Sequence, residues 1–114
     1  MPPTLQDRLH DILQAIDDIN SFLIDRTQED LKHDRQFRLA LERGLEIVSE
    51  ASRHIPDDIK ARNAQIPWER VADLGNWLRH VYHRVDMGVL WNIATNDLAV
   101  LKSCVEQLLQ DKTS

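Results

Sequence analysis

Three polar residues near position 80 have the types and the spacing that acid–base chemistry needs. Asn76 and His80 are four residues apart, so on a helix they lie about 40° apart on one face. A histidine has a reference pKa of about 6.5 and can take or give a proton near neutral pH. Tyr82 lies about 200° from His80 and follows the stripe of position 75, which Arg79 shares. The spacing therefore predicts a histidine–asparagine site with an arginine and a tyrosine on a second face.

Each of these residues also has an ordinary structural interpretation. His80 can hydrogen-bond across a helix bundle, and Tyr82 can be an interfacial aromatic with its hydroxyl in water. Arg79 can be a solvated surface charge, which is the commonest case for arginine. Spacing alone leaves these alternatives open.

Other kinds of site find little support in the sequence. The histidines do not form a His-x-x-x-His or Glu-x-x-His pattern, and no nearby carboxylate completes a convincing set of three ligands with His80 and His83. There is no glycine-rich phosphate loop. Cys104 is the single cysteine and lies in an apolar helix pattern, where burial is expected. We therefore expect no metal, no cofactor and no disulfide.

The composition indicates that helices must position these side chains. The chain has 114 residues, which suits one domain over 1–114, and it contains only 3 Gly and 4 Pro. The net charge of −5 argues against nucleic-acid binding by the overall field. Residues 70–84 differ from the rest, because this segment contains three arginines and two histidines but only one acidic residue. A polyanion, if one binds, is expected to bind to that segment.

Apolar residues recur at three- and four-residue steps and predict four main helices with one short addition. The first begins after Thr4, and Thr27 with Asp30 has the spacing of a capping box for a second start. The main helices are expected at 5–23, 34–53, 67–82 and from 86 onward, with a short helix from 55 and a bend at 95–97. Gly44 predicts a close helix–helix contact. The expected fold is all-α, an antiparallel four-helix bundle with an additional short helix.

The sequence also points to a compartment. The first residues lack the basic start and apolar core of a signal peptide, and no apolar run approaches the roughly 18 residues that span a bilayer. A single cysteine fits a reducing environment. We expect a cytoplasmic protein with no membrane association.

Several segments, in order and at matching distances, resemble the HepT-type members of the HEPN superfamily. These segments are Ala40-Leu-Glu-Arg-Gly-Leu-Glu-Ile-Val-Ser-Glu-Ala51, Ile66-Pro67-Trp68, Asn76-x-x-x-His80-x-Tyr82, Val85-Asp86 and Leu90-Trp91. The resemblance covers nearly the whole chain. Each segment alone is weak, and their combination is specific.

The resemblance implies a HEPN-like bundle that forms a homodimer and cleaves RNA without a metal ion, as the toxin of a type VII toxin–antitoxin system. It implies that His80 is the motif histidine and Asn76 its companion. It further implies an MntA-like nucleotidyltransferase antitoxin that attaches AMP to Tyr82.

The chain departs from the family pattern at one position. The family has arginine immediately before the asparagine, and this chain has Gly75. The cation expected to stabilise charge on the phosphate is therefore missing, so reduced activity is expected. Arg79, one turn further along, is a candidate replacement. The alternative is a catalytically inactive helical-bundle dimer that serves as a protein-binding module.

Overall fold

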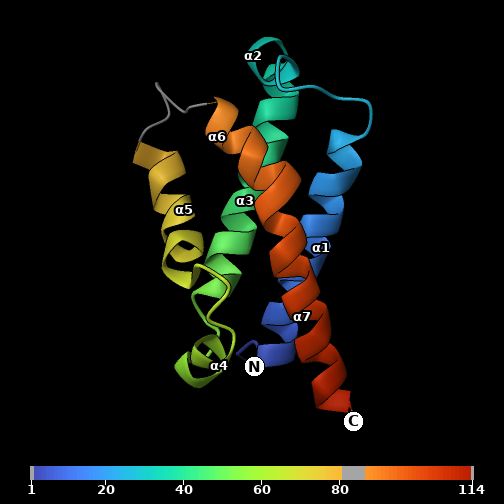
Figure 1. Cartoon of the computed structure of the whole chain (residues 1–114). Helices are drawn as coiled ribbons and strands as arrows, with labels where there is room; N and C mark the ends of the chain where they lie inside the picture. Colours follow the sequence, from blue (N-terminus) through green and yellow to red (C-terminus); the bar gives the residue numbers. More distant parts are fainter. Residues whose placement is uncertain (1, 81–86, 114) are drawn as a thin grey trace.

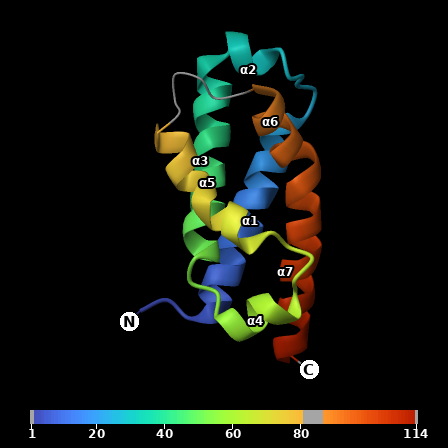
Figure 2. The same cartoon turned by 60° about the vertical axis from the view of Figure 1, so that its left-hand side comes forward.

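In the part of the chain that the structure describes, four long antiparallel helices form the body and shorter helices lie between them (Figure 1). The computed structural model describes residues 2–80 and 87–113, and these residues contain no strand. The long helices run alternately up and down (Figures 1 and 2). The elements are α1 (Leu5–Leu23), α2 (Asp30–His33), α3 (Arg35–Ser52), α4 (Asp57–Arg62), α5 (Trp68–His80), α6 (Met87–Asn92), η1 (Ile93–Asp97) and α7 (Leu98–Thr113). The predicted all-α bundle is confirmed.

The helix starts follow from local capping chemistry. Thr4 Oγ1 accepts a hydrogen bond from the Asp7 amide at 3.1 Å, and Asp7 Oδ2 accepts one from the Thr4 amide at 2.8 Å, which completes a capping box. Asp34 caps α3 by accepting from the Phe37 amide at 3.0 Å. These two starts agree with the sequence. The box predicted at Thr27 is only half formed, because Asp30 accepts from the Thr27 amide while α2 itself begins at Asp30.

Helix α3 is the centre of the bundle and packs against both α1 and α5, while α7 packs against α1. Gly44 explains how closely α1 and α3 approach. A Cβ atom at this position would lie 2.7 Å from Ile19 Cγ1, closer than such atoms can pack. The close contact predicted at Gly44 is therefore confirmed. Leu9, Ile12, Leu41 and Leu45, from the same two helices, are fully buried in the core.

The C-terminal helical segment is interrupted where the sequence predicts a bend. Residues Ile93–Asp97 form a single π-helical turn between α6 and α7. Thr95 Oγ1 donates to the Trp91 carbonyl at 2.7 Å, and Asn96 Nδ2 donates to Asn92 Oδ1 at 2.7 Å. The Thr95 bond competes with the regular backbone pattern at the Trp91 carbonyl, in keeping with a local change of helix type.

Candidate active site

Helix α5 carries the residues that the sequence singles out. Asn76 and Arg79 are both exposed on it, and His80 is its last residue. Tyr82 lies outside the described residues, and the structure describes the backbone of His80 but not its side chain. The structure thus brings Asn76 and Arg79 to one end of α5, while the grouping of His80 with them stays a prediction.

A buried serine fixes α5 against α3 at the level of position 75. Ser49 is 2% exposed, and its hydroxyl donates to the Ala72 carbonyl at 2.8 Å and accepts from the Gly75 amide at 3.1 Å. Arg53, the C-cap residue directly after α3, donates from Nε to the same Ala72 carbonyl at 3.2 Å. Two side chains, one from α3 and one from its C-cap, therefore hold one turn of α5 by its backbone, which sets the position of the site.

Gly75 leaves room for this serine and for Arg79. A Cβ atom at position 75 would lie 3.2 Å from Ser49 Oγ, tighter than most real contacts, and 3.5 Å from Arg79 Nη1. The Arg79 guanidinium thus folds back toward the position from which the family arginine would project. No hydrogen bond or ion pair joins Arg79 to another residue in 2–80 or 87–113. Gly75 therefore fits its place sterically, besides lacking the expected charge.

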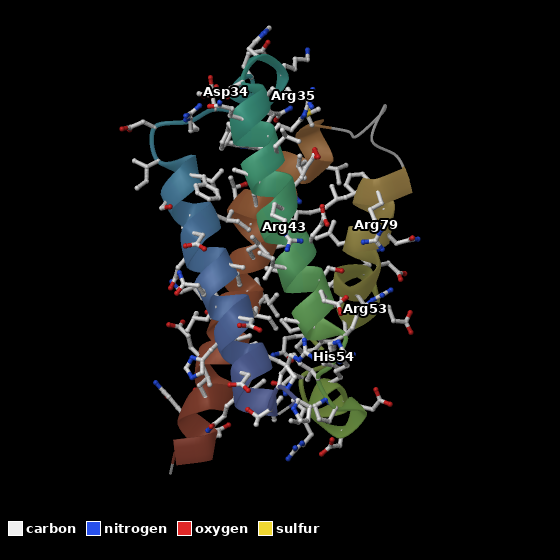
Figure 3. The ribbon with its side chains drawn as sticks, turned by 180° about the vertical axis from the view of Figure 1, so that it is seen from behind. Asp34, Arg35, Arg43, Arg53, His54 and Arg79 are labelled. Atoms are coloured by element: carbon white, nitrogen blue, oxygen red, sulfur yellow. The ribbon has the colours of Figure 1, made fainter. Side chains whose placement is uncertain are left out.

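A shallow polar groove of about 150 Å³ runs between α3 and α5 over this contact. Figure 3 shows Arg43 on α3, Arg53 at the C-terminal end of α3 and Arg79 on α5, all on one side of the molecule. The groove is lined by these three arginines together with Glu46, Ser49, Glu50, Ala72, Gly75 and Asn76.

Two carboxylates moderate the charge of this groove. Glu46 lies 3.7 Å from Arg43 Nη1, and Glu50 lies 3.2 Å from Nε2 of His54. Each interaction includes at least one side chain that is largely in water, so each contributes little to stability. The lining of the groove has three arginines and two glutamates, so its side chains carry a net positive charge, whereas the whole chain has a net charge of −5. It is a local cationic site on an acidic protein.

Other chemically reactive groups lie away from the groove. Cys104 is buried in α7, as the sequence predicts, and burial raises the pKa of its thiol, which keeps it protonated near neutral pH. In the described residues, no three His, Cys, Asp or Glu side chains come together as metal ligands would.

No described helix is both long and apolar enough to cross a bilayer.

Comparison with known proteins gives the family. The sequence model described as "Ribonuclease HepT-like" matches residues 12–108, which is most of the chain. The chain belongs to the HepT-like ribonuclease family. It is 39% identical over 103 residues to a protein of Thermococcus cleftensis named "Probable ribonuclease HepT", covering 90% of this chain and 94% of that one. It is 35% identical over 98 residues to "Putative RNase MJ1380" of Methanocaldococcus jannaschii, covering 86% and 90%. No solved structure matches it.

Sequence reasoning on this HepT-like chain missed the contribution of α3 to the groove. Arg43 and Arg53 are ordinary surface charges when the sequence is taken helix by helix, and Ser49 is one small residue on an apolar stripe. Their role depends on the register of α3 against α5, which hydrogen bonds between residues 23 and 26 positions apart determine. The serine, together with two small residues on the other helix, Ala72 and Gly75, was the available signal of a close contact.

Proposed function

We propose that this protein is a cytoplasmic, metal-independent ribonuclease and the toxin of a type VII toxin–antitoxin system. The observation that carries the proposal is the Arg79 guanidinium, which lies over Gly75 in a chain of the HepT-like ribonuclease family. It puts a cation next to the position where the family pattern has one. Asn76 lies beside it on the exposed side of α5.

The reaction follows from the chemistry of these residue types. Cleavage of RNA without a metal needs a base that takes the 2′-hydroxyl proton and an acid that protonates the leaving 5′-oxygen. Two His80 side chains from two protomers would divide these tasks. Arg79 would stabilise the charge that builds on the non-bridging phosphate oxygens, since a guanidinium matches two of them at once. Asn76 would orient the histidine or the phosphate by hydrogen bonding.

A homodimer is part of this proposal, and an apolar groove supports it. The groove lies between α5 and the η1–α7 segment and has a volume of about 450 Å³. Val89 and Val100 line it and are 45% and 52% exposed. Arg70 and Asp97 line it as well, so a second copy placed by two-fold symmetry could pair each arginine with the partner's aspartate. A groove of this composition supports a contact between two copies that is both apolar and paired in charge.

The nuclease proposal is tested by the reaction products. The purified protein should cleave single-stranded RNA equally well with and without EDTA, and the products should carry 2′,3′-cyclic phosphate ends. RNA with a 2′-O-methyl group at each residue should resist cleavage, because the attacking hydroxyl is blocked. Loss of activity in EDTA, or cleavage of the methylated RNA, would contradict the proposed chemistry. Mass spectrometry of the fragments measures both the products and their ends.

Neutralisation is proposed to occur through Tyr82, with an MntA-like nucleotidyltransferase as the antitoxin. Attack of the Tyr82 phenolate on the α-phosphate of ATP would form a tyrosyl–AMP bond and release pyrophosphate. The added phosphate brings negative charge beside the histidine pair and would repel RNA. The transferase would supply both ATP and its metal.

The acceptor is tested by intact-mass measurement. Incubation with ATP and an MntA-like nucleotidyltransferase should add AMP units and abolish RNA cleavage. The Tyr82→Phe protein should stay at its unmodified mass and remain active under the same conditions. AMP addition that persists in Tyr82→Phe would rule out this tyrosine as the acceptor.

A further inference from the structure

The groove between α3 and α5 contains more cationic groups than the proposed cleavage chemistry uses. Arg79 accounts for one, but Arg43 on α3 and Arg53 at the C-cap of α3 lie along the same groove. They lie on the same side of the molecule as Arg79, as Figure 3 shows. Their number on an otherwise acidic protein calls for an anionic ligand larger than one phosphate.

Arg53 is held in place with its terminal donors free. Its Nε donates to the Ala72 carbonyl at 3.2 Å, which fixes the guanidinium plane against α5. Within 2–80 and 87–113, its two terminal nitrogens have no hydrogen-bond partner. A guanidinium anchored in this way loses less side-chain freedom on binding, and its remaining donors suit two oxygens of one phosphate.

Arg43 is held only weakly. Its nearest acid is Glu46, at 3.7 Å from Nη1, and the Arg43 side chain is 71% exposed. An exposed pair at this distance is worth little and exchanges readily for a stronger partner. Glu50, the other acid of the groove, is 3.2 Å from Nε2 of His54. The two carboxylates therefore have partners of their own, and they do not occupy the donors of Arg53 or Arg79.

We propose that Arg43 and Arg53 bind backbone phosphates of RNA next to the phosphate that is cleaved. This inference rests on the proposed nuclease function and extends its substrate site from α5 onto α3. The groove is continuous from Arg53 and Arg43 to Asn76 and Arg79, so one strand can contact both helices. RNA fits better than an acidic peptide, because guanidinium groups with two free donors match successive phosphodiesters and the adjoining residues are those proposed to cleave them. Arg43 and Arg53 are positioning residues, and they select for a charged backbone rather than for a base sequence.

Binding of an uncleaved RNA tests the proposal. Fluorescence anisotropy of a labelled 12-nucleotide single-stranded RNA is measured on the His80→Ala protein, so that cleavage does not interfere. Adding Arg53→Gln or Arg43→Gln should weaken RNA binding about 10-fold. The association constant should also fall less steeply with salt: the negative slope of log K against log salt should become shallower by about 0.7 for each phosphate that the variant no longer neutralises. The Arg43 variant keeps the hydrogen bond of Arg53 to Ala72, so its folding is not at issue. Arg62→Gln is the control, because Arg62 is also an exposed arginine that is paired with an acid, on α4 and away from the groove.

The outcomes separate this inference from the nuclease proposal. In the protein with His80 intact, Arg43→Gln and Arg53→Gln should raise KM several-fold and leave kcat nearly unchanged, since they bind away from the reacting phosphate. The inference would be overturned if Arg43→Gln and Arg62→Gln weakened RNA binding equally. It would also be overturned if the groove variants bound RNA as the parent does but no longer bound polyglutamate, an acidic peptide. If the protein cleaves RNA and the groove variants behave like the parent, only the groove assignment fails. If it binds RNA through the groove but never cleaves it, the nuclease proposal fails, and Arg43 and Arg53 remain RNA-binding residues without a cleavage site beside them.

Discussion

Replacing His80 by alanine is expected to reduce RNA cleavage by about 10²- to 10⁴-fold, the usual contribution of a positioned acid or base. The residue ends α5, one turn after Asn76 and directly after Arg79. Alanine continues a helix well, so the variant should keep the circular dichroism and the unfolding temperature of the parent. Initial rates on a labelled RNA measure the loss. Cleavage equal to that of the parent would remove His80 from the mechanism.

Mixed dimers show whether two His80 side chains act together. In the homodimer proposed above, co-expression of the parent with His80→Ala, each with its own affinity tag, would yield a heterodimer that has one histidine. If one histidine is the base and its partner the acid, this heterodimer should be as inactive as the dimer in which both chains carry His80→Ala. A heterodimer with about half the parent activity would mean that each protomer has an independent site. A tagged parent–parent dimer, purified in the same way, is the control.

Much of the fold follows from local sequence signals. The Thr4 capping box, the Asp34 cap and the three- and four-residue apolar spacing fix the main helices, and the polar run at 95–97 marks the π-helical turn. Gly44 signals the α1–α3 contact because a small residue in mid-helix is unfavourable unless something packs against it. Thr27 shows where such signals fail. Its half of the box is not formed, and α2 starts at Asp30 rather than directly after Thr27.

The groove could not be predicted in the same way. Its residues come from two helices, and only the tertiary register of α3 against α5 brings Arg43 and Arg53 next to Asn76 and Arg79. The spacing of residues along a helix shows which of them share a face. It does not show the axial register of one helix against another. Position 75 shows the difference. From sequence it is a missing charge, whereas in the structure it is also the point where the Ser49 hydroxyl reaches the α5 backbone.

Arg79 is expected to be the cation that replaces the missing arginine of position 75. Arg79→Ala should lower kcat by about 10²- to 10³-fold, as loss of one donor to a developing oxyanion does in other enzymes. The expected change in KM is small, because charge on the phosphate oxygens rises in the transition state. Arg79→Lys should recover part of the loss, since it restores the charge but not the two-donor geometry. An Arg79→Ala protein as active as the parent would exclude this role.

A second substitution at position 75 distinguishes replacement from a merely useful surface charge. If Arg79 takes the place of the family arginine, Gly75→Arg should restore cleavage to Arg79→Ala, while Gly75→Ala should not. In the parent, Gly75→Arg should give little gain, because Arg79 Nη1 already lies 3.5 Å from where its Cβ would be and Ser49 Oγ lies 3.2 Å away. That second contact requires α5 or Ser49 to shift by a few tenths of an ångström, and Gly75→Ala measures its effect on the unfolding temperature separately.

A large gain from Gly75→Arg alone would mean that Arg79 does not fill the role and that the native chain is a degenerate nuclease. No cleavage in any of these variants would favour the non-catalytic binding module, since restoring the charge would then have restored nothing.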